Sequence, residues 1–197
     1  MGLSDEAAPP PIQLIEFRGE ANEVRSHALR YTMHPHFLRA FHRIGEVNPY
    51  DLAVITVPPR PGRTFRKVAP RGIRPGDPIT LVGYGANQFS MDASGRVEPF
   101  GGGVLRIGYN RATRVLHGMI EFIGVARNEG RRGRQSSNGH GDSGGPMFNR
   151  RGDIVGVTSG GEVRRVRNRL RTVARHVDLN SESSRGFLQR FLGDSDN

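Results

Sequence analysis

The chain has 197 residues, a formal net charge of +10 and no cysteine. Its length allows one substantial hydrophobic core or two small ones, and the lack of cysteine excludes a fold held by disulfides. No segment approaches the roughly 18 apolar residues of a membrane span, and residues 1–11 lack the basic and apolar regions of a signal peptide.

In chain order, the acidic and proline-rich residues 1–11 are expected to form a disordered leader. Apolar periodicity then predicts strands over residues 12–18, 23–33 and 51–57. Asn48-Pro49 favours a turn just ahead of Asp51. Residues 58–77 are rich in proline and are expected to form a connector.

The second half of the chain consists of short apolar runs separated by glycine and proline, a pattern typical of β-proteins. The expected strands lie near residues 78–85, 103–109, 118–125, 146–149, 153–159 and 170–179. Ser181 is expected to cap a short helix, because the apolar residues after it share one helical face. These residues are Phe187, Leu188, Phe191 and Leu192.

The sequence GHGDSGGP, residues 139–146, surrounds Ser143 with glycines. A serine hydroxyl is a weak nucleophile until a base takes its proton and an anion site receives the developing charge. Gly141 has no Cβ, so the backbone can aim the N–H groups of Gly141 and Ser143 at one point, as an oxyanion hole. Six specific residues in order before a strand favour such a site over a simple glycine turn.

The segment GDSGGP resembles the nucleophile loop of chymotrypsin-like serine proteases. Further segments resemble this family in the family's own order: MHPHF (33–37), DLAVITV (51–57), LVGYG (81–85), DIVGVTSGG (153–161) and RHVDL (175–179). The resemblance implies an all-β fold of two antiparallel six-stranded Greek-key β-barrels and a short C-terminal helix.

The first barrel is expected to be incomplete, because the chain resembles a family member truncated at its N-terminus. The expected domains are a partial N-terminal barrel with its connector over 12–76, a C-terminal barrel over 77–180 and a helix over 181–193.

The resemblance also implies roles for single residues. Ser143 would be the nucleophile, and Asp51 the carboxylate that orients the base. Ser159 and Gly161 would line the strand against which a peptide lies. Ser137 would lie at the base of the primary specificity pocket. A serine there carries no charge, which predicts an apolar or medium-sized P1 side chain.

The base itself is missing from the pattern, since the family's histidine turn, TA-x-H, does not occur before Asp51. The histidines ahead of Asp51 have simpler interpretations as strand or loop residues: His27, His34, His36 and His42. The sequence therefore predicts a serine endopeptidase that is nearly inert, since losing the histidine costs on the order of a millionfold in rate. The alternative is a pseudoprotease that binds a protein or peptide without turnover.

Arginine supplies almost all the basic residues, and the densest run is residues 164–171. No aromatic side chain lies within that run, so a solvated hairpin is favoured over a nucleic-acid surface. The sequence shows neither a metal-spaced cluster nor a phosphate-binding loop, and no cofactor is expected. A bacterial family member without disulfides fits the composition. Its full-length parent would be secreted or periplasmic, although an intracellular location also fits.

Overall fold

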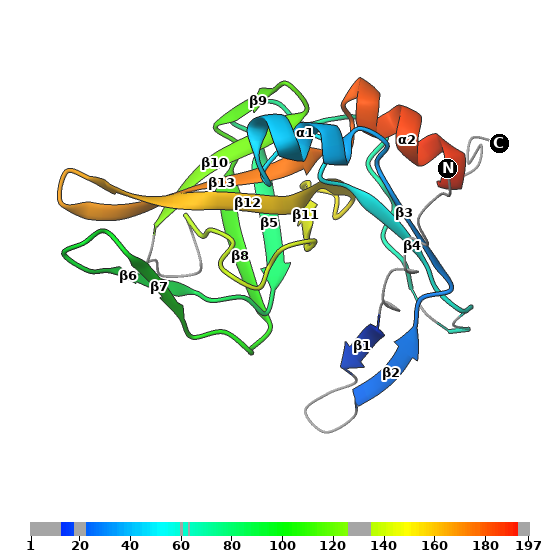
Figure 1. Cartoon of the computed structure of the whole chain (residues 1–197), viewed down its shortest axis with the longest axis horizontal. Coiled ribbons are helices and arrows are strands. Elements are labelled where there is room, and N and C mark those ends of the chain that lie inside the picture. Colours follow the sequence, from blue (N-terminus) through cyan, green and yellow to red (C-terminus); the bar gives the residue numbers. More distant parts are fainter. Residues whose placement is uncertain (1–12, 18–22, 60, 63, 126–134, 193–197) are drawn as a thin grey trace, which may run out of the picture. The chain divides into compact units, whose positions relative to one another are not determined.

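The computed structural model describes residues 13–17, 23–59, 61–62, 64–125 and 135–192 (Figure 1). The predicted leader, residues 1–11, lies outside the described residues. Internal contacts divide the chain into two compact units. One comprises Met1–Met33 with Ala53–Arg63, and the other His34–Leu52 with Thr64–Asn197. No helix in the described ranges is long and apolar enough to cross a membrane.

The first unit contains two antiparallel strand pairs. β1 (Gln13–Phe17) pairs with β2 (Glu23–His27), and β3 (Arg30–Met33) pairs with β4 (Ala53–Thr56). The sequence predicted one strand over 23–33, but the structure divides it between β2 and β3. The break falls at Ala28 and Leu29, and the amide of Leu29 still donates to the carbonyl of Thr56 at 2.8 Å.

The second unit is built on a seven-stranded sheet in the order β8-β5-β11-β12-β13-β10-β9, in which all neighbours are antiparallel. Its strands are β5 (Pro78–Gly83), β8 (Arg106–Arg111), β9 (Arg114–Leu116), β10 (Met119–Val125), β11 (Pro146–Phe148), β12 (Ile154–Val166) and β13 (Arg169–Asp178). The expected all-β class is confirmed, while closure into barrels stays a prediction.

The core lies on one face of this sheet. Buried residues alternate along the strands, as in Ile79 and Leu81 of β5 and in Ile120 and Phe122 of β10. Met147, Val155 and Ala174 from three further strands also belong to the cluster, as do Ala69 and Ala112. Alternation places every second side chain on the same face, so these short runs suffice to build one core.

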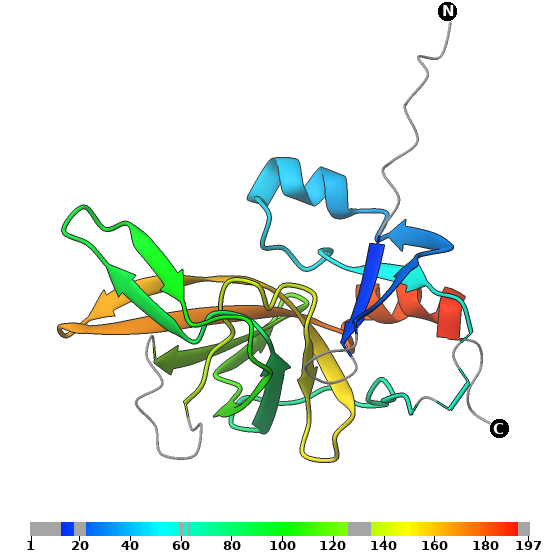
Figure 2. The same ribbon diagram turned by 90° about the horizontal axis from the view of Figure 1, so that it is seen from below.

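β12 and β13 form a long hairpin that extends beyond the rest of the sheet (Figures 1 and 2). The sequence predicted a strand ending near residue 159, whereas β12 continues to Val166. Arg167 and Asn168 turn the chain with φ of 47° and 61°, the conformation that suits a two-residue hairpin loop. A shorter hairpin, β6 (Gln88–Met91) with β7 (Val97–Phe100), was not predicted.

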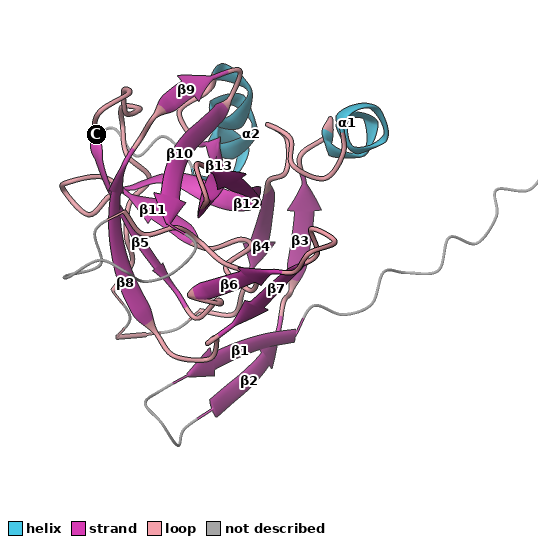
Figure 3. Ribbon diagram, turned by 90° about the vertical axis from the view of Figure 1, so that its left-hand side faces the viewer, coloured by secondary structure: helices cyan, strands magenta, loops and turns pink. Residues whose placement is uncertain are grey.

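The described residues of the second unit also form two helices (Figure 3). The C-terminal helix is confirmed as α2 (Glu182–Leu192), and the hydroxyl of Ser181 accepts from the amide of Ser184 at 3.2 Å. The expected loop around His42 is wrong, because residues 37–44 form α1. The run FLRAFHRI repeats its apolar residues at helical spacing, which favours a helix.

Candidate active site

A short loop after α1 positions Asp51. Asn48 is almost fully buried and holds this loop from within. Its side-chain amide donates to the carbonyls of Gly45 and Glu46 at 3.0 and 3.1 Å, and its oxygen accepts from the amide of Tyr50 at 2.9 Å. The turn expected at Asn48-Pro49 is thus present, with Asp51 as the residue that leaves it.

The carboxylate of Asp51 reaches β12. Its Oδ2 accepts a hydrogen bond from the hydroxyl of Ser159 at 2.7 Å, across 108 residues of sequence. Burial raises the pKa of Asp51, the Ser159 bond acts against this, and the nearby Glu46 carboxylate adds to it. The structure therefore brings two of the expected site residues into direct contact.

The loop around Ser143 shows which backbone amides are available. Gly141 has φ of 96°, and Ser143 is exposed. The amides of Gly144 and Gly145 are used, donating to the carbonyls of Thr158 and Asp142, each at 2.9 Å. Within the described part of the chain, the amides of Gly141 and Ser143 have no acceptor. Two unpaired donors thus lie on either side of Asp142, next to the Ser143 hydroxyl.

The carboxylate of Asp142 is held by backbone amides. Its two carboxylate oxygens accept from the amides of Gly85 and Gly139, each at 2.8 Å. A Cβ on Gly83 or Gly85 would overlap this carboxylate, and a Cβ on Gly139 would overlap the carbonyl oxygen of Ala86. The glycines at these positions therefore let β5 and the loop of Ser143 approach closely.

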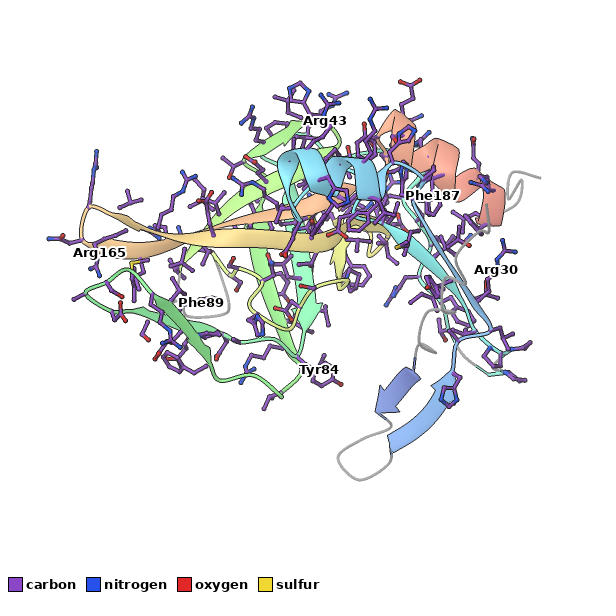
Figure 4. All side chains as sticks on the ribbon, in the orientation of Figure 1. Arg30, Arg43, Tyr84, Phe89, Arg165 and Phe187 are labelled. Carbon is purple, nitrogen blue, oxygen red and sulfur yellow. The ribbon has the colours of Figure 1, made fainter. Side chains whose placement is uncertain are left out.

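A cavity of about 580 Å³ opens beside Ser143. Ser137, Ser159 and Gly161 line it together with Ser143, so four of the residues selected from the sequence share one cleft. The β6–β7 hairpin contributes the opposite wall, including Phe89, which Figure 4 labels. The uncharged residues Asn138, Thr172 and Ala174 line the same cleft as Ser137, and so do Glu46 and Glu162.

Ser143 also borders a second cavity, of about 610 Å³, on the side of β5 and β11. Its lining is mainly apolar, with Val82, Leu105 and Phe148, and Arg66 and Arg150 are also part of it. Ser143 therefore lies between a more polar cleft along β12 and a more apolar one over β5.

The histidines ahead of Asp51 have other roles or positions. His34 is buried, and its Nδ1 accepts from the amide of His36 at 3.2 Å, so its Nε2 carries the proton that faces the Ser183 hydroxyl at 3.0 Å. Burial lowers the pKa of His34, which keeps this ring neutral. His36 packs edge-on against Tyr50, His42 lies on α1, and His27 ends β2 of the first unit.

Three histidines follow Asp51 in the sequence, His117, His140 and His176, and the sequence pattern predicts none of them as a base. His140 lines the same cavity as Ser143, and its place three residues before the serine was the signal for it. His176 is fully buried, its pKa is lowered to about 3, and its Nε2 lies 2.9 Å from the Thr158 hydroxyl. In the described residues, no histidine makes a hydrogen bond to Ser143 or Asp51. The same residues contain no group of three side chains suited to a metal ion.

A family model, the trypsin-like peptidase domain, matches residues 13–157 of the chain. The chain belongs to this family. The match spans both Asp51 and Ser143, and it confirms the family resemblance seen in the sequence. No curated protein sequence matches the chain.

A solved structure, described as Glu endopeptidase in complex with MPD, is similar to this trypsin-like peptidase domain. The TM-score is 0.55 and the sequence identity 17%, over 85% of this chain and 64% of the other. The likeness shows a shared fold. The chain thus spans slightly less than two thirds of the length of that structure.

Proposed function

We propose that this trypsin-like peptidase domain carries the serine part of an endopeptidase site, with Ser143 as nucleophile. The unpaired amides of Gly141 and Ser143 carry this proposal, because preorganised donors at the point of developing charge are the main requirement for acyl transfer. Asp51, fixed by Ser159, is the carboxylate available to orient a base.

The substrate in this proposal is a polypeptide that lies along β12 at Ser159 and Gly161, with its P1 side chain in the 580 Å³ cleft. Ser137 itself carries no charge, which favours a neutral P1 residue, apolar or of medium size. Glu46 and Glu162 also border the cleft. Arg164 and Arg175 already bind the Glu162 carboxylate, so Glu162 is a poor partner for a basic P1 side chain.

Turnover by this chain is expected to be slow. Without a histidine bonded to Ser143, proton removal falls to water, at a cost on the order of a millionfold. This same observation favours the second candidate, a pseudoprotease that binds peptides in the cleft without cleaving them.

An activated ester separates the two candidates, because its good leaving group makes acylation less dependent on a base. The chain is treated with p-nitrophenyl acetate, with and without added imidazole as a base, and the acetylated residue is located by mass spectrometry. An endopeptidase site predicts an acetyl group on Ser143, formed faster with imidazole, and none at this position in Ser143→Ala.

A labelled peptide amide is then incubated with the chain under the same conditions. Imidazole-dependent cleavage that Ser143→Ala abolishes supports the endopeptidase. Peptide binding with no acetylation of Ser143 supports the pseudoprotease.

A further inference from the structure

The outer half of β12 has one free edge. β11 pairs with β12 up to Val157, and backbone hydrogen bonds with Gly145 and Gly144 extend this contact to Thr158. From Ser159 to Val166, the strand pairs only with β13 among the described residues. A free edge of this kind offers unpaired N–H and C=O groups to an added strand.

The same half of the hairpin is strongly basic. Residues 164–171, here called the arginine arm, contain Arg164, Arg165, Arg167, Arg169 and Arg171. All of these except Arg171 are exposed, and Figure 4 shows Arg165 at the outer end of the hairpin. In the described structure, Arg165, Arg167 and Arg169 have no ion-pair partner.

The arm places like charges against one another. Arg164 lies directly opposite Arg171 in the register, and Arg169 is opposite Val166 on the same face. Like charges at directly opposed positions destabilise a strand pair. Glu162 is the one acidic residue between positions 159 and 175, and its Oε1 is shared between Arg164 at 2.6 Å and Arg175 at 3.0 Å. The excess positive charge is therefore not compensated within the hairpin.

The arm continues directly from the cleft beside Ser143. Glu162 and Val163 of β12, with Thr172 and Val173 of β13, line that cleft and lead into the arm. At about 3.3 Å per residue, Arg164 lies roughly 17 Å along the strand from Ser159. A peptide that pairs antiparallel with β12 in the cleft runs along this strand in the opposite direction. The peptide residues that precede the cleavage point therefore lie over the arginine arm.

We propose that the arginine arm binds acidic side chains of the polypeptide substrate, about five to eight residues before the cleavage point. This inference rests on the proposed function, since that function sets the peptide along β12. An acidic segment of the substrate is the ligand that fits the arm, because the arm is positively charged and the free edge of β12 continues from the cleft. A single-stranded nucleic acid fits less well, because no aromatic side chain on the arm offers a stacking surface.

The test measures peptide binding to Ser143→Ala, so that cleavage does not interfere. Three fluorescein-labelled peptides share one neutral segment: one has four Glu residues before it, one has four Glu residues after it, and one has four Gln residues before it. We expect the first to bind about tenfold more tightly than the other two, because several exposed charge pairs add. Raising the salt from about 0.05 M to 0.5 M should remove most of this preference.

Matched variants locate the effect. Arg165→Gln/Arg167→Gln/Arg169→Gln should abolish the preference for upstream Glu. The control Arg71→Gln/Arg74→Gln/Arg151→Gln removes the same charge from exposed arginines outside both cavities, and should preserve it. A proline within the upstream Glu segment should weaken binding, since it removes a strand hydrogen bond.

Equal binding of the upstream and downstream Glu peptides would overturn the proposal. The proposal would also be overturned if the control variant lost as much of the preference for upstream Glu as the arm variant does. Tighter, arm-dependent binding of an oligo-dT of the same charge would instead assign the arm to nucleic acid. Because binding to Ser143→Ala needs no nucleophile, the result is independent of whether Ser143 is acetylated in the wild type.

Discussion

The two loops that contribute the polar groups of the site are held in different ways. The loop of Ser143 is fixed by backbone: Asp142 accepts two main-chain amides, and Gly139 packs against the main chain of Ala86. The loop of Asp51 is fixed by side chains, through Asn48 inside it and Ser159 on β12. Glycine and aspartate in a tight loop form a readable motif, whereas a buried asparagine in a loop does not.

The largest effect is expected at Gly139. A methyl group there would overlap the Ala86 carbonyl oxygen, and the backbone cannot move aside as a flexible side chain can. Gly139→Ala should lower the free energy of unfolding by about 3 kcal/mol, at the upper end of overpacking costs. Urea unfolding measures it, with Gly186→Ala as a control, because a Cβ at Gly186 meets no atom within 4 Å. An equal loss of stability at both positions would contradict the conclusion that the loop of Ser143 is fixed by backbone contacts.

Asp142→Asn should cost about 2 kcal/mol. A carboxamide offers one acceptor oxygen where the carboxylate offers two, so the amide of Gly85 or of Gly139 loses its partner. Chemical denaturation gives the loss of stability. Amide hydrogen exchange should show faster exchange at one of these two glycines. Unchanged protection of both amides would show that they are held by something other than Asp142.

Asn48→Ala should cost about 1–2 kcal/mol and act on the other loop. The substitution leaves the carbonyls of Gly45 and Glu46 and the amide of Tyr50 without their partner. In NMR spectra, shifts should concentrate in residues 45–52 and at Ser159, with the Gly141 and Ser143 resonances little changed. Shifts of equal size around Ser143 would mean that the two loops are not held independently.

The smallest effect is a pH dependence at Asp51. Burial and Glu46 raise the pKa of Asp51 above its value of 3.8 in the unfolded chain. Protonated Asp51 therefore stabilises the folded state below pH 3.8, and this contribution is lost as the pH rises through the raised pKa of the folded state. Asp51→Asn keeps an acceptor for Ser159 and cannot ionise. Its stability relative to the wild type should therefore increase from pH 3.5 to pH 7, as measured by thermal unfolding. If the stability of Asp51→Asn relative to the wild type decreased from pH 3.5 to pH 7, the pKa of Asp51 would be lowered by folding and not raised.

Much of this architecture is readable from the sequence, and the parts that are not share a physical reason. Alternating apolar runs predict the core strands, and Ser181 with Phe187 predicts α2. The length of β12 is not readable, because Gly160 and Gly161, a residue type depleted in strands, follow Ser159, and the strand continues beyond them through pairing with β13. The helix α1 is readable as an apolar stripe at helical spacing, although a loop was predicted around His42.

The same division holds for the site. GDSGGP predicts a loop with free amides, and the family resemblance assigns Asp51 to the same site as Ser143. The bond from Asp51 to Ser159 and the placement of His140 at the cleft depend on how distant segments pack, which no local pattern encodes. The partner of Asp142 was also beyond reach, because it is supplied by two main-chain amides rather than by a charged side chain.

The most direct test is to observe the backbone amides while an anionic adduct forms at Ser143. A peptide boronic acid is added to the ¹⁵N-labelled chain, and amide shifts are followed by NMR, with Ser143→Ala as a control. The amides of Gly141 and Ser143 should shift strongly and together, while those of Gly144 and Gly145, which already have carbonyl acceptors, shift little. A boronate that binds without moving the Gly141 and Ser143 amides, or that moves them equally in Ser143→Ala, would contradict the proposed acyl-transfer site.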